Sequence, residues 1–165
     1  MGPGSTVLVH GANGGVGSTL VQLARNAGAR VIGTAAPRHA DAVRALGAEP
    51  VDRTDPELPS QIRELAPSGV DAVFDHVGGP GLLDSWRLLA PGGTLASYGT
   101  AAAKVEPGAS RLPFLRLLGR PLADGTLTAH VAARVPLPDA AAAMRLAESH
   151  TVLGKVVLVP AAGTG

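Results

Sequence analysis

The sequence predicts an α/β protein with a doubly wound parallel sheet and helices on both faces. Short apolar, β-branched runs alternate with longer segments whose apolar residues recur at helical spacing. The strand-like runs are almost continuously apolar, which is typical of parallel strands that are buried on both faces. The chain has 165 residues, of which 45% are hydrophobic but only 2% aromatic, so we expect one domain-sized aliphatic core.

Five strands are expected in the first hundred residues. Each is a short run rich in apolar or β-branched residues. They are Val7–His10, Arg30–Thr34, Pro50–Asp52, Val70–Asp75 and Thr94–Tyr98. Right-handed crossovers between consecutive parallel strands would make the sheet doubly wound.

Helices are expected between these strands. The first carries apolar residues at helical spacing from Val16 to Ala27 and ends at Gly28, in the position of a C′ glycine. The second opens at Pro37 and ends at Gly47.

The third and fourth helices have equally clear signals. Asp55-Pro56 provides a cap and a first-turn proline for the third. An apolar face predicts the fourth, formed by Leu82, Leu83, Trp86 and Leu89. Pro91-Gly-Gly93 is expected to form a turn before the fifth strand.

The pattern changes after Gly99. We expect a short helix at Leu112–Leu118, interrupted by Arg120-Pro121, and then a strand, a helix and a strand at Thr128–Val135, Asp139–Ser149 and Lys155–Val159. The chain is therefore divided into a dinucleotide-binding core, residues 1–120, and a C-terminal tail, residues 121–165, that packs on it.

Composition excludes several classes of function. A net charge of +1 and the absence of a basic stripe argue against a nucleic-acid partner. The chain has no cysteine, which excludes disulfides, a thiolate zinc site and a cysteine nucleophile, and no His/Asp/Glu cluster has metal-ligand spacing. No apolar run is long enough to span a membrane, and the N-terminus does not resemble a signal peptide, so we expect a cytoplasmic protein without a membrane partner.

The strongest chemical signal is the segment His10-Gly-Ala-Asn-Gly-Gly-Val-Gly17, between the first strand and the first helix. It contains GxGxxG spacing with Ala12 in the first place, Gly14 in the second and Gly17 in the third. A small residue permits the tight turn, the second glycine lets a pyrophosphate approach, and the third lets helix and strand pack closely. The amides of Gly14, Gly15 and Val16 would face the phosphates at a helix N-terminus.

Other glycine-loop classes fit less well. A Walker A loop needs Gly-Lys-Ser/Thr, but Ser18 follows Gly17 directly. A short-chain dehydrogenase needs a lysine four residues after its tyrosine, but Ala102 is four residues after Tyr98. A methyltransferase remains open because Pro91-Gly-Gly93 before a strand is common there, although the acid that usually follows its second strand is absent.

The residues after the second strand favour NADP(H) over NAD(H). NAD-binding folds place an acid there for the ribose hydroxyls, whereas here the first acid after the glycine loop is Asp41. Small neutral residues followed by Arg38 and His39 suit a 2′-phosphate better. The alternative is that Arg38 is a solvated residue at the start of a helix.

Two aromatic side chains follow strands at the expected ligand-binding edge. His76 follows the fourth strand and Tyr98 ends the fifth, where open α/β sheets bind ligands. Each could equally have a structural role, as a hydrogen-bonded strand-end histidine and as a core aromatic with a solvated hydroxyl. His10, His130 and His150 are expected to be incidental.

Several motifs in order resemble the zinc-independent medium-chain dehydrogenases/reductases, in particular the NADPH:quinone oxidoreductase (zeta-crystallin-like) group, which includes enoyl reductases. They are the glycine loop, Val-Ile-Gly-Thr34, Leu-Gly-Ala48, Val-Phe-Asp-His-Val-Gly-Gly79, Leu-Ala-Pro-Gly-Gly93, Ser-Tyr-Gly99 and Gly-Lys-Val-Val-Leu158. The resemblance implies a Rossmann fold. It covers roughly residues 3–100 and 122–160.

The resemblance also implies roles for individual positions. Asn13–Val16 would hold the pyrophosphate, a basic residue near Arg38 or His39 would meet the 2′-phosphate, and His76 and Tyr98 would lie near the adenosine and nicotinamide halves. Asp52 stands where many members have a tyrosine. The expected cofactor-binding residues are Asn13, Gly14, Gly15, Val16, Thr34, Arg38, His39, His76, Val77, Gly78, Tyr98 and Gly99.

Two hypotheses about function follow. The first is the NADP(H)-binding domain of an enzyme that transfers hydride to a small quinone or enone without a metal; no catalytic residue is assigned. The family's N-terminal GroES-like catalytic domain is absent from this chain, so we expect little or no activity from the chain alone. The second is a non-catalytic nucleotide-binding or assembly module. We also expect exposed apolar edges on the tail and self-association as a homo-oligomer.

Overall fold

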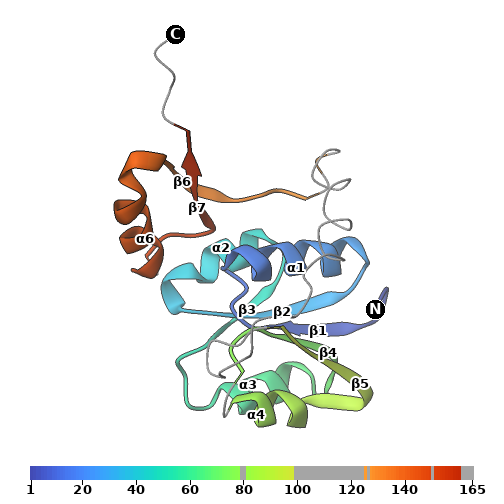
Figure 1. Ribbon diagram of the computed structural model, residues 1–165. Helices are drawn as coiled ribbons and strands as arrows, with labels where there is room; N and C mark the ends of the chain where they lie inside the picture. The colour runs from blue at the N-terminus through green and yellow to red at the C-terminus, as the bar shows by residue number, and fades with distance from the viewer. Residues whose placement is uncertain (79–80, 99–124, 126, 150, 161–165) are drawn as a thin grey trace.

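A parallel five-stranded sheet forms the centre of the molecule (Figure 1). The computed structural model describes residues 1–78, 81–98, 125, 127–149 and 151–160. The strands of this sheet are β1 (Thr6–Val9), β2 (Arg30–Ala35), β3 (Glu49–Asp52), β4 (Val70–Asp75) and β5 (Leu89–Ser97). Their order is β3-β2-β1-β4-β5, and every neighbouring pair is parallel. The chain therefore reverses its direction of winding between β1 and β4, where such folds bind ligands.

Helices cover both faces of the sheet, which confirms the predicted doubly wound fold. On one face lie α1 (Gly15–Asn26), the short 3-10 helix η1 (Pro37–His39) and α2 (Ala40–Ala45). The opposite face is covered by α3 (Leu58–Leu65) and α4 (Gly81–Arg87), as Figure 1 shows.

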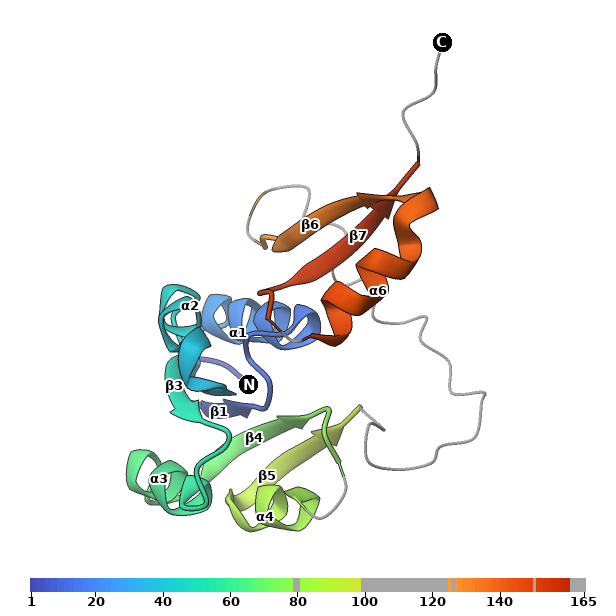
Figure 2. The ribbon, with the colours of Figure 1, turned by 90° about the vertical axis from the view of Figure 1, so that its left-hand side faces the viewer.

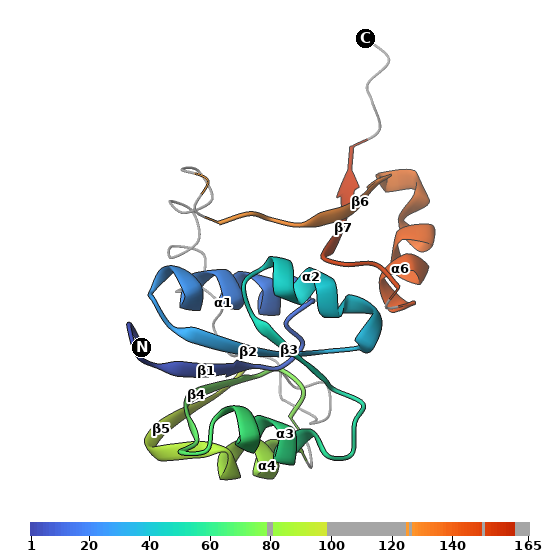
Figure 3. The ribbon, with the colours of Figure 1, turned by 180° about the vertical axis from the view of Figure 1, so that it is seen from behind.

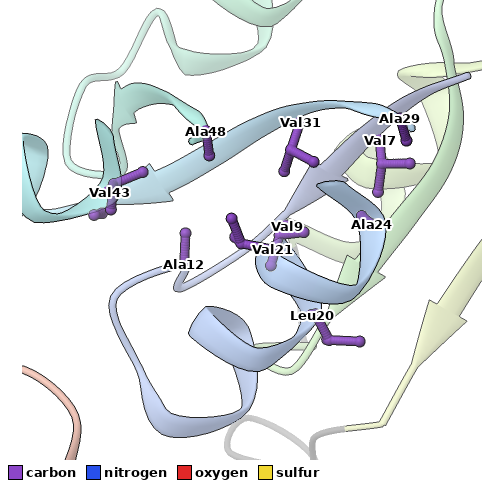
Figure 4. Close-up of a cluster of buried hydrophobic side chains, with 11 residues drawn as sticks. Val7, Val9, Ala12, Leu20, Val21, Ala24, Ala29, Val31, Val43 and Ala48 are labelled. Carbon is purple, nitrogen blue, oxygen red and sulfur yellow. The ribbon is translucent and has the colours of Figure 1, made fainter. Parts of the chain in front are cut away.

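Alternating residues of the strands build two aliphatic layers. In β1, Val7 and Val9 belong to the layer under α1, together with Val21 of that helix (Figure 4). Leu8 points to the other layer, where it packs with Ile32 and residues of α3. All three β1 side chains are fully buried, and burying each contributes about 1.5–3 kcal/mol. No aromatic side chain is among the core residues that the structure describes as fully buried, as the composition predicted.

Two expectations for the region around α4 need correction. Leu83 and Trp86 are more than half exposed, whereas Leu82 is half-buried and Leu89, which begins β5, packs against the core, so only part of the predicted apolar face is buried. The seven-residue helix instead places the small side chain of Ser85 against the sheet, and Leu88 after it is buried. Pro91–Gly93 lie within β5 rather than in a turn, and the pairing with β4 shifts register there. Proline is tolerated because β5 is the last strand of the described sheet.

The C-terminal unit, residues 127–160, is a separate strand–helix–strand element. It contains β6 (Val131–Pro136), η2 (Leu137–Asp139), α6 (Ala140–Glu148) and β7 (Lys155–Val159), and its two strands are parallel. It lies over α1 and α2, so that these helices separate it from the central sheet (Figures 2 and 3). The expected helix at Leu112–Leu118 lies outside the described residues.

A side-chain amide attaches the C-terminal unit to α1. Gln22 Nε2 donates a hydrogen bond to the Thr128 carbonyl at 3.2 Å, and the Thr128 amide donates to Gln22 Oε1 at 2.9 Å. The Gln22 side-chain amide pairs with Thr128 as a neighbouring strand would, and it satisfies both the N–H and the C=O of Thr128. This contact fixes the start of the unit beside α1.

Candidate functional site

The loop between β1 and α1 presents an uncapped helix N-terminus. Gly11 has φ +64°, a left-handed conformation that favours glycine, and the Ala12 amide donates to the Thr34 carbonyl at 2.9 Å. Gly14 is the N-cap and offers no side-chain oxygen, and the first turn of α1 has no acidic residue. The amides of this turn therefore form an anion-binding arrangement with the helix dipole behind it.

Close backbone approach explains the third glycine of the loop. A Cβ built on Gly17 would overlap the Gly11 carbonyl oxygen and lie 3.0 Å from Ala12 Cα. Both neighbours are backbone atoms, which have no rotamer to change. Gly17 was predicted to let the helix pack closely on the strand; the close contact in the structure is with the loop that follows β1.

A buried polar network joins the loop to the ends of β2 and β4. His10 Nε2 lies 3.0 Å from Ser85 Oγ, and His10 Nδ1 lies 3.3 Å from Thr34 Oγ1. Ser85 Oγ in turn donates to Asp75 Oδ2 at 3.2 Å, and the Gly11 amide donates to Thr34 Oγ1 at 3.2 Å.

The donors and acceptors of this network specify one tautomer of His10. The Ser85 hydroxyl has one proton and gives it to the Asp75 carboxylate, so His10 Nε2 must donate to Ser85 Oγ. His10 Nδ1 is then an acceptor and receives the Thr34 hydroxyl proton. A neutral imidazole satisfies every member. The expectation that His10 is incidental is wrong, and because Ser85 lies 75 positions away, no local sequence pattern could have found this pair.

Burial and hydrogen bonding shift the pKa values of His10 and Asp75. Burial lowers the pKa of the His10 imidazole; Asp75 raises it and His76 lowers it further, and the pKa remains below the usual 6.5. Burial raises the pKa of the Asp75 carboxyl, but hydrogen bonds from the Gly78 and Val77 amides, together with His10 and Ser85, outweigh it and hold the pKa below 3.8. The Gly78 and Val77 amide nitrogens lie 2.9 and 2.7 Å from Asp75 Oδ1.

His76 and Tyr98 stack at the carboxyl ends of β4 and β5. Their ring centroids are 6.2 Å apart with 26° between the planes. His76 Nδ1 lies 3.1 Å from the His10 carbonyl oxygen, so Nδ1 is the donor of this hydrogen bond. Burial and the Asp75 charge raise the pKa of Tyr98 to about 12, which keeps its hydroxyl protonated.

Two cavities flank the glycine loop. The cationic cavity, about 280 Å³, is lined by Arg38, His39, Arg53 and Lys155 around Asn13 and Gly14, with uncharged residues completing the wall. Its described lining includes no carboxylate. The His76 cavity, about 390 Å³, lies below it toward α3 and α4 and is lined by both polar and apolar groups.

The cationic cavity contains an unsatisfied buried group. His39 is only 7% exposed, and its Nε2 is buried without a hydrogen-bond partner. An unpaired buried polar atom is costly, and such atoms in native proteins are usually satisfied by a ligand or water. The described lining of this cavity thus combines basic side chains with no carboxylate, and His39 in its wall has a buried ring nitrogen without a hydrogen-bond partner.

The structure distributes the predicted site residues over these features. Asn13, Gly14, Arg38 and His39 line the cationic cavity. Thr34, His76, Val77 and Gly78 line the His76 cavity. Gly15 and Val16 form the first turn of α1, Tyr98 contacts His76, and Gly99 lies outside the described residues.

Two cationic residues were missed from the sequence. Arg53 follows β3 directly, at the ligand-binding edge of the sheet, and that position could have indicated it. Lys155 begins β7 and reaches the cavity only through the position of the C-terminal unit. In the part of the chain that the structure describes, no three His, Asp or Glu side chains could hold a metal ion. No helix there is both long and apolar enough to cross a membrane.

Known proteins share both the sequence and the fold of this chain. The family described as zinc-binding dehydrogenase matches residues 15–123. A 2-haloacrylate reductase from Burkholderia sp is 31% identical over 97% of the chain and 57% of its own length. The human synaptic vesicle membrane protein VAT-1 homolog is 37% identical over 64% of the chain and 27% of its own length.

Solved structures of similar sequence have the same fold as this chain. A Pseudomonas syringae quinone oxidoreductase superposes with a TM-score of 0.82 and 29% identity, covering 97% of this chain and 58% of that one. A mycobacterial protein complexed with NADPH gives a TM-score of 0.82 and 33% identity at the same coverage. The chain thus spans somewhat more than half the length of the 2-haloacrylate reductase and of these two solved structures. From its sequence match and its parallel fold, the chain belongs to the zinc-binding dehydrogenase family and forms the cofactor-binding domain of a medium-chain dehydrogenase/reductase.

Proposed function

We propose that this domain binds NADP(H) in preference to NAD(H), and that the complete protein transfers hydride to a small quinone or enone. The observation that carries the cofactor preference is the cationic cavity beside the glycine loop, with Arg38, His39 and Arg53 in its wall and no described carboxylate. A 2′-phosphate there would place its negative charge beside these basic side chains.

The acidic residues near the cavity are engaged elsewhere. Asp52, at the end of β3, accepts hydrogen bonds from the amide and hydroxyl of Thr54 at 2.8 and 2.7 Å. Asp41 pairs with Arg44 at 2.7 Å. β2 ends at Ala35 and is followed by Ala36, so no acid is positioned there to accept two ribose hydroxyls. This arrangement supports a phosphorylated ribose.

We expect the bound dinucleotide to extend across the glycine loop, from its phosphates to its nicotinamide. The first-turn amides at Gly14–Val16 would hold the pyrophosphate, the His76 cavity would receive part of the nucleoside, and Tyr98 would lie toward the nicotinamide half. When bound, the reduced nicotinamide supplies the hydride. The protonated Tyr98 hydroxyl and the stacked His76 would orient groups at this edge and exclude water.

The substrate class is supported by the relatives. Their names include a 2-haloacrylate reductase, a quinone oxidoreductase and an enoyl reductase. All three names denote reductive chemistry, and haloacrylates, quinones and enoyl groups share an electron-poor carbon–carbon double bond conjugated to a carbonyl. Such an alkene accepts hydride at one carbon and a proton at the other, so no metal is needed to balance the reaction.

Calorimetric titration of the purified chain with NADPH and NADH tests the proposal. NADPH should bind more tightly, and Arg38→Ala should weaken NADPH by about tenfold while changing NADH little, because a charged hydrogen bond contributes about 1.5–3 kcal/mol. Arg44→Ala is the matched control, since Arg44 lies on the same segment but pairs with Asp41. Equal or tighter binding of NADH would refute the preference.

Turnover separates the enzyme from a nucleotide-binding module. In the complete protein, a quinone should accelerate NADPH oxidation. Tight NADPH binding without quinone- or enone-dependent oxidation would favour the module.

A further inference from the structure

Asn13 and Gly14 form an asparagine–glycine pair in the turn between β1 and α1. The side-chain carbonyl carbon of an asparagine can close a five-membered ring with the backbone nitrogen of the next residue. Glycine in the next position has no side chain to obstruct that approach. The chain has one other asparagine, Asn26, which is followed by Ala27. The two asparagines therefore differ in their intrinsic tendency to lose ammonia.

The structure leaves the Asn13 side chain free to react. It is half-buried, it lines the cationic cavity, and its carboxamide has no hydrogen-bond partner among the residues that the structure describes. Water therefore reaches this side chain, and no contact in the described part of the chain fixes its rotamer. Asn26, in contrast, is the last residue of α1, where helical backbone surrounds it.

One hydrogen bond restrains the atom that would attack. The Gly14 amide donates to the Gly11 carbonyl at 2.9 Å and closes the turn. This bond must open before the nitrogen can lose its proton, and loops open at a lower free-energy cost than helices in the core. The Ala27 amide donates to the Leu23 carbonyl at 3.0 Å at the end of α1. Asn13 should thus react more slowly in the folded chain than in the unfolded chain, but faster than Asn26.

The charges around Asn13 favour both the reaction and its product. Attack on the carboxamide places negative charge on its oxygen, and the final product is a carboxylate. The partially positive N-terminus of α1 follows directly, and its first turn contains no acidic residue. The described lining of the adjacent cavity has basic side chains and no carboxylate. The surroundings that suit a phosphate therefore also stabilise a negative charge at position 13.

We propose that Asn13 is a site of spontaneous deamidation, and that its conversion to an acid closes the anion-binding turn. The Gly14 nitrogen attacks Asn13 Cγ, the N–Cγ bond forms, the Cγ–Nδ2 bond breaks, and ammonia leaves with the proton of the Gly14 amide. Water then adds to either carbonyl carbon of the cyclic imide and opens it to aspartate or isoaspartate, with release of a proton. The new carboxylate repels phosphate, and isoaspartate also lengthens the backbone beside the first-turn amides. The loss of ligand binding rests on the proposed function, whereas the chemical step does not.

Peptide mapping by mass spectrometry tests the chemical step. The purified chain is incubated in mildly alkaline buffer, either folded or in urea, with and without inorganic pyrophosphate. Trypsin cleavage after Arg25 then places Asn13 and Asn26 in different peptides. Asn13 should convert in the folded chain while Asn26 stays intact, and pyrophosphate should slow the conversion because it occupies the turn. If Asn13 stays intact in the folded chain while the chain in urea converts it, the proposal is overturned.

Two aspartate variants test the consequence for binding. Asn13→Asp supplies the charge of the product, and Asn26→Asp, the matched control, makes the same change at the other end of α1. Asn13→Asp should weaken NADPH and pyrophosphate by about tenfold at low salt and less at high salt, because like charges repel and salt screens them. Asn26→Asp should bind both ligands as the wild type does.

Urea denaturation separates charge repulsion from damage to the loop. Asn13→Asp should be at least as stable as the wild type, because a carboxylate is favourable near a helix N-terminus. A clearly less stable Asn13→Asp protein would assign the lost affinity to a damaged loop and overturn the electrostatic explanation.

Binding during incubation distinguishes this inference from the proposed function. The NADPH-binding fraction of the wild type should fall in step with conversion of Asn13, whereas Asn13→Ser, which cannot form the imide, should keep its own starting affinity. Undiminished binding by a converted chain would overturn the closure of the turn and leave the proposed function standing. A fresh wild-type chain that binds neither ligand would refute the proposed function and the closure together, and the peptide map would still decide the chemical step.

Discussion

Gly17→Ala tests whether backbone contact or helix propensity decides the stability of the glycine loop. Alanine in place of glycine inside a helix normally stabilises by about 0.5–1 kcal/mol. At Gly17, however, the added methyl would overlap the Gly11 carbonyl oxygen and press on Ala12 Cα. Overpacking of this kind costs about 1–3 kcal/mol, occasionally more. Because only backbone atoms would have to move, we expect a net loss of about 1–3 kcal/mol.

Gly15→Ala is the matched control, two residues earlier in the same turn. Its methyl would meet only the end of the Lys155 side chain, which is flexible and can move away. We therefore expect the free energy of unfolding to be unchanged or to rise by a few tenths of a kcal/mol, roughly half of the propensity gain or less. The free energy of unfolding should thus separate the two substitutions, because their neighbours differ in whether they can move.

Urea denaturation followed by circular dichroism measures both variants. The slope with urea should match wild type, so that midpoints report stability directly. A Gly17→Ala protein at least as stable as wild type would refute the reasoning from the backbone overlap. So would equal destabilisation by both substitutions, because the neighbours would then not matter.

Three further predictions concern the buried polar network. The free energy of unfolding should fall as pH decreases below about 6.5, because His10 takes up a proton more readily in the unfolded chain than in the folded one. Urea denaturation at successive pH values measures this slope, and His10→Asn should flatten it. Asp75→Asn should lower the free energy of unfolding by about 1–3 kcal/mol in the same assay, because it weakens the acceptor for the Val77 and Gly78 amides. The control Asp84→Asn removes an exposed ion pair and should cost about 0–1 kcal/mol. Thr34→Val should cost about 1–3 kcal/mol in thermal or urea unfolding by leaving the part-buried Gly11 amide and His10 Nδ1 unpaired, and a neutral result would contradict a stabilising role for these two contacts.

The sequence predicts the parts of this molecule that depend on neighbours along the chain. Val70–Asp75 and Lys155–Val159 match β4 and β7 residue for residue, since both are short runs rich in β-branched and other apolar residues. The position of the glycine loop between β1 and α1 was equally clear because its tight turn depends on local backbone geometry. Leu83 and Trp86 misled because helical spacing shows which residues share a face but not whether the sheet reaches that face.

The electrostatics of the site could be predicted only in part. Arg38 and His39 follow a strand in sequence, so their place in the cationic cavity was foreseeable. Lys155 was not, because its approach to Gly15 depends on how a distant strand–helix–strand element docks on α1. Long-range contacts of this kind leave no periodic signal in a single sequence.

The network of His10, Thr34, Asp75 and Ser85 has a consequence for how this site tolerates substitution. Each side chain satisfies another, so removing one leaves its neighbour unpaired and lowers the further cost of removing that neighbour. The four positions should therefore be strongly epistatic: double replacements should cost less than the sum of the single ones. A lineage that loses His10 would be free to change Ser85 next, so these positions are expected to vary together rather than one at a time.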